Sequence, residues 1–211
     1  MIKSIIKTVV PAKWWEIFKE IRVILDWYRA GRPIPAPAFF KRKILKEYAR
    51  LGKANIFIET GTNTGATVKK LNRFFDRTIS IEIYPPLATA AKKRFKHNPA
   101  VTIIEGDSSE ILPIILSEIK EPVLFWLDGH YSGTGTGKGI SDTPIVREIN
   151  AILDHPVKNH LILIDDARCF NGLGDYPKLE ELHALIKQNN PNLHFKVDND
   201  IIRIMTSNDT Y

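Results

Sequence analysis

The hydrophobic positions between residues 54 and 206 follow two spacings that alternate along the chain. Short, continuous apolar runs predict buried strands, and segments whose apolar residues recur every three or four positions predict amphipathic helices. The runs predict strands at residues 55–59, 78–83, 101–105, 122–128 and 159–165. The helical spacing predicts helices at residues 64–74, 85–97, 108–119, 142–153 and 176–189. Regular alternation of this kind is typical of an α/β protein with a doubly wound, mostly parallel sheet.

The last two apolar segments differ from the others because so few residues separate them. Leu193–Val197 and Ile201–Met205 each predict a strand, and only residues 198–200 lie between them. A gap of this length joins antiparallel strands in a hairpin, whereas parallel strands need a much longer crossover. The sequence therefore predicts a seven-stranded sheet whose parallel part is closed by a C-terminal antiparallel hairpin.

Residues 1–53 predict a helical appendage ahead of the sheet. Pro11 predicts a helix start, residues 31–33 predict its end, and three prolines up to Pro37 predict a stiff connector. Apolar residues recur at helical intervals in the first helix: Trp14, Trp15, Phe18, Ile21, Ile24, Leu25 and Tyr28. A second helix is predicted over residues 39–51, with its Lys and Arg side chains toward solvent. The apolar face would lie on an anionic membrane surface, or it would pack on the domain or on a second copy of the chain.

Length and charge divide the chain at the same place. The 211 residues suffice for one domain, residues 54–211, plus the appendage of residues 1–53, and 44% hydrophobic residues are enough for a core. Residues 1–53 hold 13 Lys or Arg against 4 Asp or Glu, a net charge of +9, and the rest hold 17 against 20, a net charge of −3. Because the basic excess belongs to the appendage, the pattern argues against a nucleic-acid groove across the domain.

The composition also bears on the compartment. No uninterrupted apolar run approaches the roughly 20 residues of a membrane-spanning helix, and the first residues lack the pattern of a signal peptide. Cys169 is the single cysteine, which suits a reducing compartment and predicts a packed thiol rather than a nucleophile. We expect a cytoplasmic protein, with residues 1–53 as the part that would touch a membrane surface or a second copy.

A glycine-containing turn follows the first predicted strand of the domain. In the segment Ile-Phe-Ile-Glu-Thr-Gly-Thr-Asn-Thr-Gly that ends at Gly65, an acid, Glu59, precedes Gly61 by two residues. Glycine lets a backbone approach a ligand where a β-carbon would collide. A dinucleotide fingerprint would need glycine at the positions of Asn63 and Ala66, so the turn does not match that motif.

This turn resembles motif I of the class I S-adenosylmethionine (SAM) dependent methyltransferases. The resemblance implies that SAM is the cofactor, that the acid helps to hold its methionine end and that the glycines admit its ribose and methionine parts. The implied cofactor-binding residues of the turn are Glu59, Gly61, Thr62, Asn63 and Gly65. The alternative is a tight strand-to-helix turn in another α/β protein. The C-terminal hairpin supports the resemblance, because class I methyltransferases combine a parallel sheet with such a hairpin.

Two further acids end predicted strands downstream of the turn. Glu82 lies about 20 residues beyond it, where a carboxylate can accept hydrogen bonds from both ribose hydroxyls. Asp107 resembles the acid of this family that reads the adenine amine, and Ser108 offers a backbone N–H beside it. The alternative for Asp107 or Ser108 is capping of the helix that follows, and one residue can do both. Strands ending in Glu59, Glu82 and Asp107 place three acids along the sheet edge where ligands bind.

A second group of acids points to a metal ion. Asp128 ends one predicted strand, and Asp165 and Asp166 end another. If these strands are neighbours, three carboxylates converge, repel one another and raise one another's pKa. A hard divalent cation such as Mg²⁺ removes that cost by taking oxygen ligands from all three. The alternative is separate roles: one acid on the cofactor, one capping a helix and one paired with Arg168.

The placement of these acids resembles the metal-dependent O-methyltransferases, in particular the catechol type and the macrocin (sugar-modifying) type. The catechol type has a lysine base three residues after the first metal-binding Asp, and Tyr131 stands at that position here. His130 is the first candidate for the catalytic base because imidazole titrates near neutrality, and Asp128 is the second. The alternative for His130 is a backbone hydrogen-bonding role.

The glycine-rich segment Ser132–Ile140 predicts either a lid over bound substrate or a surface loop. Asp142 or Thr143 then predicts a helix N-cap, with Pro144 in the first turn. These observations together predict a SAM-dependent O-methyltransferase, assisted by Mg²⁺, that acts on a hydroxyl of a small molecule or sugar. Two alternatives stay open: a hydroxylase-like enzyme of the same fold that uses the acids for iron, and a non-catalytic adaptor docked on a membrane through residues 1–53.

Overall fold

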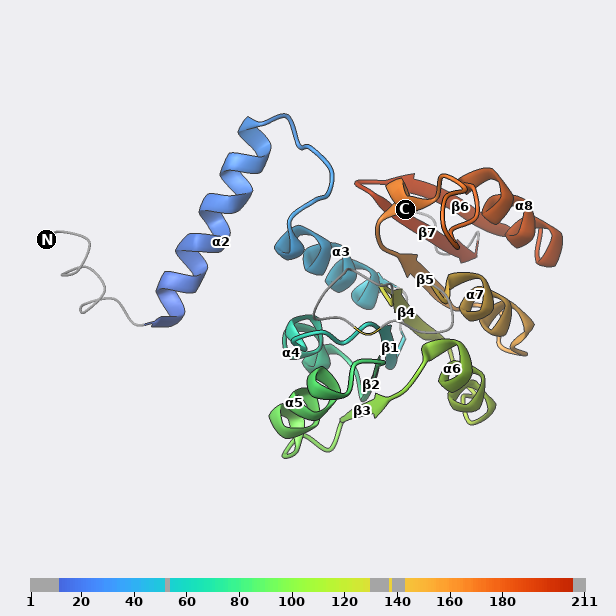
Figure 1. The fold of residues 1–211 in the computed structure, drawn as a ribbon, viewed down its shortest axis with the longest axis horizontal. Coiled ribbons are helices and arrows are strands. Elements are labelled where there is room, and N and C mark those ends of the chain that lie inside the picture. Colours follow the sequence, from blue (N-terminus) through green and yellow to red (C-terminus); the bar gives the residue numbers. More distant parts are fainter. Residues whose placement is uncertain (1–11, 52–53, 130–136, 138–142, 207–211) are drawn as a thin grey trace, which may run out of the picture.

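The computed structural model describes residues 12–51, 54–129, 137 and 143–206, and these residues form a seven-stranded sheet covered by helices (Figure 1). The strands are β1 (Ile56–Thr60), β2 (Arg77–Glu82), β3 (Val101–Glu105), β4 (Val123–Leu127), β5 (Leu161–Ile164), β6 (Leu193–Asp198) and β7 (Ile201–Thr206). The helices are α2 (Ala12–Arg29), α3 (Ala38–Leu51), α4 (Ala66–Leu71), α5 (Pro85–Phe95), α6 (Ser108–Ser117), α7 (Ile145–Asp154) and α8 (Leu179–Asn189).

The strand order is β3-β2-β1-β4-β5-β7-β6, and the sheet is mostly parallel. Strands β1 to β5 pair in parallel, whereas β7 pairs antiparallel with both β5 and β6. The predicted doubly wound sheet with a closing hairpin is therefore confirmed. Chain order reverses beside β1, which lies between β2 and β4, and in such sheets the crevice at this reversal is where ligands bind.

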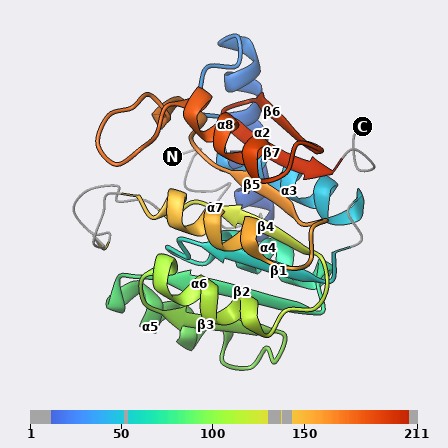
Figure 2. The ribbon, with the colours of Figure 1, turned by 90° about the vertical axis from the view of Figure 1, so that its right-hand side faces the viewer.

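Helices cover both faces of the sheet because its central strands are apolar on both sides (Figure 2). Alternate strand residues such as Ile58 and Phe125 pack with buried side chains of α6, α7 and α8. The intervening residues, such as Phe57 and Trp126, pack on the other face with Leu45 of α3 and with α4. A smaller cluster joins α4, α5 and β3 on that same side. The three clusters hold the carboxyl ends of β1, β2, β4 and β5 in a fixed arrangement.

Several predicted boundaries move by a few residues for local reasons. The predicted strand 159–165 shortens to β5 at both ends. At its start, the His160 ring accepts the hydrogen bond of Val123 N, and at its end Asp165 lies just beyond the last strand residue. The predicted helix 64–74 becomes α4 followed by a 3-10 turn over residues 72–74. The predicted helix 176–189 begins only at Leu179, after an isolated bridge between Asn171 and Lys178.

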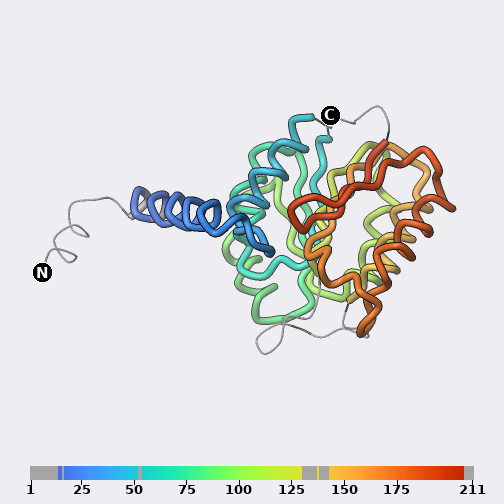
Figure 3. The backbone as a smooth tube through the Cα atoms, turned by 90° about the horizontal axis from the view of Figure 1, so that it is seen from above, coloured from blue at the N-terminus to red at the C-terminus, as the bar shows by residue number. Residues whose placement is uncertain are grey.

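The two helices of the appendage behave differently. Helix α3 packs on the sheet through Ile44, Leu45 and Ala49 and is part of the domain's core. Helix α2 extends away from the domain (Figures 1 and 3). Its C-terminal end is held at Trp27, whose Nε1 donates to the carbonyl oxygen of Pro33 at 2.7 Å and whose ring packs on Phe40. The division at residue 53 stays a prediction.

Helix α2 presents large apolar side chains to solvent. The exposed ones are Trp14, Phe18, Ile21, Val23, Leu25 and Tyr28. Among the residues that the structure describes, no helix is both long enough and apolar enough to cross a membrane.

A chain of buried histidines joins α6, α7, β4 and β5 at the amino ends of the strands. His160 Nδ1 accepts from Val123 N at 3.1 Å, so the His160 proton is on Nε2, which lies 3.0 Å from His155 Nδ1. His155 Nε2 in turn lies 3.0 Å from the carbonyl oxygen of Leu116 and donates to it. Every ring nitrogen of the two imidazoles thus has a hydrogen-bond partner. Burial, with His155 and Lys158 nearby, lowers the pKa of His160 to about 4.

We expect this chain to make stability fall in mild acid. The folded pKa of His160 lies below the usual 6.5, so only the unfolded chain takes up this proton as the pH falls from 6.5 to 4. The free energy of unfolding should drop by on the order of 3 kcal/mol over that range from this group. Urea unfolding at pH 7 and pH 4.5 measures it, with His160→Gln as the comparison, since glutamine keeps an acceptor and a donor without titrating. An equal acid loss in the wild type and the variant would contradict the assignment.

Candidate functional site

A cavity of about 420 Å³ opens at the carboxyl ends of β1, β2, β4 and β5. This volume is in the range of small-ligand sites. Its acidic lining residues are Glu82, Asp107, Asp128, Asp165 and Asp166. Residues of the appendage complete the wall, including Lys41 and Leu45 of α3. The segment before the first strand is thus part of the same cavity as the predicted site acids.

The two glycines of the turn are required by the chain itself. Gly61 has φ +86°, and a β-carbon there would lie 2.4 Å from the carbonyl oxygen of Asp128. Gly65 has φ +69°, and a β-carbon there would lie 2.8 Å from the Phe95 ring. Each glycine thus makes room for another part of the protein, and the expectation that both admit a ligand stays a prediction. Gly61 also lines the cavity, whereas Gly65 is buried.

Glu59 and Thr62 lie behind the cavity wall. Ser80 Oγ donates to Glu59 Oε2 at 2.6 Å, and Thr62 Oγ1 lies 2.6 Å from the same Ser80 oxygen. Burial raises the pKa of Glu59 to about 8, so this carboxyl is protonated at neutral pH. The structure thus gives Glu59 a place in a buried hydrogen-bond chain that joins β1, β2 and the turn. Its contact with the methionine end of a cofactor stays a prediction.

Glu82 holds the glycine turn and faces the cavity. Its Oε2 accepts from Asn63 N at 2.7 Å, and its Oε1 accepts from Tyr84 N at 2.9 Å. A carboxylate has about four lone-pair sites, so each oxygen can accept a second hydrogen bond. Asn63 has φ +48° and lines the cavity beside Glu82. This geometry suits recognition of a vicinal diol.

Asp107 caps α6, as the alternative for this residue predicted. Its Oδ1 accepts from the Ser109 N–H at 2.9 Å and from the Ser109 hydroxyl at 2.8 Å. Asp107 and Ser108 both line the cavity at the amino end of α6. Capping therefore fixes the carboxylate at the wall, where the proposed contact with an adenine amine stays a prediction.

The three acids of the predicted metal site come together. Leu127 pairs with Ile164 at the ends of β4 and β5, and the ladder continues as Asp128 N donates to Thr60 O and Asp165 N donates to Leu127 O. One oxygen from each of Asp128, Asp165 and Asp166 lies within 4.8 Å of the others. Asp166 has φ +57°, and its N–H donates to Asp165 Oδ1 at 2.8 Å. This left-handed turn aims two consecutive carboxylates at the same place.

Burial dominates the electrostatics of these acids. It raises the pKa of Asp128 well above its usual range, and the charges of Asp165 and Asp166 raise it further. Burial likewise raises the pKa of Asp165 to about 6, although Lys41 partly offsets it. For Asp166, Lys41 and Arg168 outweigh burial and hold the pKa below its usual range.

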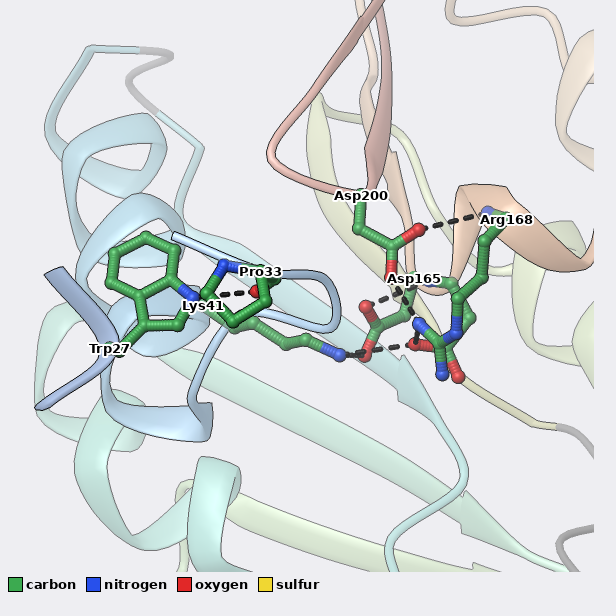
Figure 4. A network of polar contacts seen from close by, with 7 residues as sticks. Trp27, Pro33, Lys41, Asp165, Arg168 and Asp200 are labelled. Atoms are coloured by element: carbon green, nitrogen blue, oxygen red, sulfur yellow. Dashed lines mark hydrogen bonds and ion pairs between the residues drawn. The ribbon is translucent and has the colours of Figure 1, made fainter. Parts of the chain in front are cut away.

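Two cations reach this acid cluster from opposite sides (Figure 4). Lys41 Nζ lies 2.6 Å from Asp165 Oδ2 and 3.1 Å from Asp166 Oδ1. Arg168 Nη1 lies 2.8 Å from Asp166 Oδ1 and also pairs with Asp200 in the β6–β7 turn. One of the predicted alternatives was an acid paired with Arg168, and Asp166 forms this pair. The donor set fits a hard divalent cation, since it consists of carboxylate oxygens, but Lys41 uses two of the same residues.

Lys41 is the site residue that the sequence pattern missed. The prediction that the basic side chains of the second helix face solvent is wrong for Lys41 and Arg42, whose side chains are only 14% exposed. It holds for Lys43, at 62% exposure. Lys41 precedes Ile44 and Leu45 by three and four residues, which places it on the buried face of α3. A charged residue on an apolar stripe was the available signal.

Some predicted residues fall outside the described part of the chain. His130, Tyr131, Asp142 and most of the segment 132–140 belong to this group, so their roles stay predictions. Gly137 is described: it lines the cavity, and a β-carbon there would lie 2.6 Å from Ile83 Cγ2. Thr143 Oγ1 accepts from Ile145 N at 3.4 Å, but α7 begins at Ile145 and its N-cap position is Pro144, so the predictions of an N-cap at Thr143 and of Pro144 in the first turn are wrong by one residue.

Solved structures share this fold. An O-methyltransferase from Bacillus cereus in complex with SAH matches with a TM-score of 0.60 and 15% identity, over 88% of this chain and 89% of that one. The O-methyltransferase TomG from Streptomyces achromogenes in complex with SAM matches with a TM-score of 0.60 and 17% identity, over 88% of each chain. The SAH-bound methyltransferase PaMTH1 from Podospora anserina matches with a TM-score of 0.57 and 16% identity, over 88% of this chain and 87% of that one. No protein-family model and no curated protein sequence matches the chain. The chain has the Rossmann-like methyltransferase fold.

Proposed function

We propose that this protein is a SAM-dependent O-methyltransferase that acts on a hydroxyl group of a small molecule or sugar. The observation that carries the proposal is one cavity whose wall holds Glu82 and Asp107 as well as the acids after β4 and β5. The shared fold supports it, because the B. cereus and S. achromogenes O-methyltransferases were solved with SAH and SAM.

On this proposal the first half of the sheet binds the cofactor. Each carboxylate oxygen of Glu82 accepts one backbone hydrogen bond, from Asn63 N or Tyr84 N, and has a second lone pair to accept a hydrogen bond from a ribose hydroxyl. Asp107 accepts from the adenine amine, and the backbone of Ser108 lies beside it. Gly61 lines the methionine side of the cavity, while Glu59, Thr62 and Gly65 support the turn from behind.

The acids after β4 and β5 hold a divalent cation on this proposal, with Mg²⁺ as the first choice. When bound, the ion would supply Lewis acidity that lowers the pKa of the acceptor hydroxyl. Asp128, Asp165 and Asp166 would orient it, and the buried cavity would hold the acceptor in line with the methyl donor. His130 is proposed to take the hydroxyl proton, with Asp128 as the second candidate.

Calorimetric titration with SAM and with NAD, each with and without Mg²⁺, tests the cofactor. We expect SAM to bind with a stoichiometry near one and NAD to give no heat of binding. Release of SAH on addition of catechols or sugar diols then tests the acceptor class. Binding of NAD, or no binding of SAM, would refute the proposal.

Glu82→Gln should weaken SAM binding by about tenfold to a hundredfold. The amide places an NH₂ group against one of two backbone N–H donors and removes the charge, and hydrogen bonds to a charged group contribute about 1.5–3 kcal/mol each. Glu105→Gln is the matched control, since Glu105 pairs with Glu82 in the sheet register but is exposed and bridges to Lys92. Calorimetry on both variants measures the difference. Equal effects of the two substitutions would remove Glu82 from the cofactor site.

We further propose that α2 is a contact surface, either for an anionic membrane or for a second copy of the chain. Its exposed apolar side chains support this, because four of them, at positions 14, 18, 21 and 25, follow helical spacing. Flotation with anionic vesicles and light scattering of the free protein distinguish the two contacts. A monomer that fails to float would refute both.

A further inference from the structure

The ammonium group of Lys41 lies inside the acid cluster. The pairs to Asp165 at 2.6 Å and to Asp166 at 3.1 Å are short, and the side chains involved are 14%, 5% and 10% exposed. These distances are those of charge-assisted hydrogen bonds that solvent screens little. Lys41 is therefore a built-in part of the cluster and differs from a flexible surface lysine.

The fold fixes this placement. Lys41 belongs to the first turn of α3, which begins at Ala38 after Pro37. Three and four residues later, Ile44 and Leu45 are buried in the core against β1, β4 and β5. The helix thus carries the lysine stem along the sheet toward the ends of β4 and β5 (Figure 4).

An ammonium group and a divalent cation cannot use the same carboxylate oxygens at once, because they need different distances to them. The ammonium donates from about 2.6–3.1 Å, whereas Mg²⁺ needs its oxygen ligands at about 2.1 Å. Lysine has no lone pair while it is charged, so it cannot join the coordination shell. Two cations at one cluster also repel each other strongly where burial limits screening.

We propose that Lys41 competes with a divalent cation for Asp165 and Asp166, so that the site takes up metal only when the ammonium leaves it. Arg168 need not leave when a metal ion binds, because it pairs with Asp200 as well as with Asp166 and approaches the cluster from the side opposite Lys41. Lys41 also lines the cavity, so the displaced ammonium has space there without leaving the site. The inference rests on the proposed assignment of the acids to metal and is independent of SAM.

Calorimetric titration of the full chain with Mn²⁺ tests the competition. Lys41→Met keeps most of the stem and removes the charge, and we expect it to bind Mn²⁺ at least tenfold more tightly than the wild type. Lys43→Met is the control: Lys43 lies on the same helix, is exposed and pairs only loosely with Glu47, at 3.8 Å. That variant should bind within about twofold of the wild type, which excludes a general effect of net charge. Lys41→Met that binds no better than the wild type, or not at all, overturns the proposal.

A second measurement uses the wild-type protein and does not depend on the folding of a variant. Acetylation of Lys41 by acetic anhydride, followed by peptide mass spectrometry, should become at least threefold faster as Mn²⁺ is raised, while acetylation of Lys43 stays constant. An unchanged rate at Lys41 overturns the proposal. SAM titration of the same samples separates the two questions: loss of SAM binding alone would refute the proposed function, and an unaltered Mn²⁺ response would refute the competition.

Discussion

Asp165→Asn is expected to reduce methyl transfer about a thousandfold while SAM affinity stays within about threefold. Asparagine keeps the oxygen that accepts from Asp166 N but removes the charge that a divalent ion would need. A bound ion's stabilisation of a developing oxyanion amounts to several kcal/mol, and about 4 kcal/mol corresponds to a factor of a thousand. Turnover measured as SAH release, together with calorimetry for SAM, gives the two numbers.

Asp154→Asn is the matched control for this substitution. Asp154 is an exposed acid at the end of α7 and does not line the cavity. It should leave both turnover and SAM affinity unchanged. If Asp165→Asn loses turnover and SAM binding to the same extent, Asp165 belongs to the cofactor site or to the fold and holds no metal.

Gly61→Ala should destabilise the fold by about 3 kcal/mol and weaken SAM binding at least tenfold. The added methyl group would lie 2.4 Å from the Asp128 carbonyl oxygen, which is backbone and cannot move aside without shifting the end of β4. The left-handed φ of +86° adds a cost of about 1–2 kcal/mol for any residue with a β-carbon. Urea unfolding and SAM titration measure the two effects.

Gly31→Ala separates the collision from the backbone strain. Gly31 has a similar φ of +80°, but a β-carbon there would meet nothing within 4 Å. It should therefore show only the smaller strain cost, with SAM binding intact. Equal destabilisation by the two substitutions would mean that the close approach of Gly61 to β4 has no energetic weight.

The sheet could be predicted because its signal is local. Continuous apolar runs such as residues 123–127 indicate buried parallel strands when helical segments alternate with them. The gap at residues 198–200 is too short for a parallel crossover and allows only an antiparallel hairpin. The convergence of Asp128 with Asp165 follows from the same logic, because both residues directly follow parallel strands. Only the neighbouring position of β4 and β5 had to be assumed, and the register of the two strands supplies it.

The contributions from distant segments could not be predicted in this way. Lys41 reaches the cluster because α3 packs on the face of the sheet, and this tertiary contact leaves no local signal in the sequence. From the sequence alone, a basic residue in a helix is expected to face solvent. The residues that a β-carbon at Gly61 or Gly65 would meet lie just after β4 and on α5, so the motif indicated that glycine was needed without indicating which contact required it. Glu59 lies behind the cavity wall, where Ser80 Oγ on the adjacent strand donates to its carboxyl group, and no local pattern indicated this partner.

The contact between Lys41 and Asp165 joins residues 124 positions apart. During synthesis the helix that carries the lysine leaves the ribosome early, and its acidic partners follow only after all five parallel strands have been made. The contact can form only after β5 and the two acids that follow it have been made, so this end of the cavity is completed late in synthesis. A nascent chain that stalls before β5 would therefore carry Lys41 without Asp165 and Asp166, the two acids that pair with it in the folded protein.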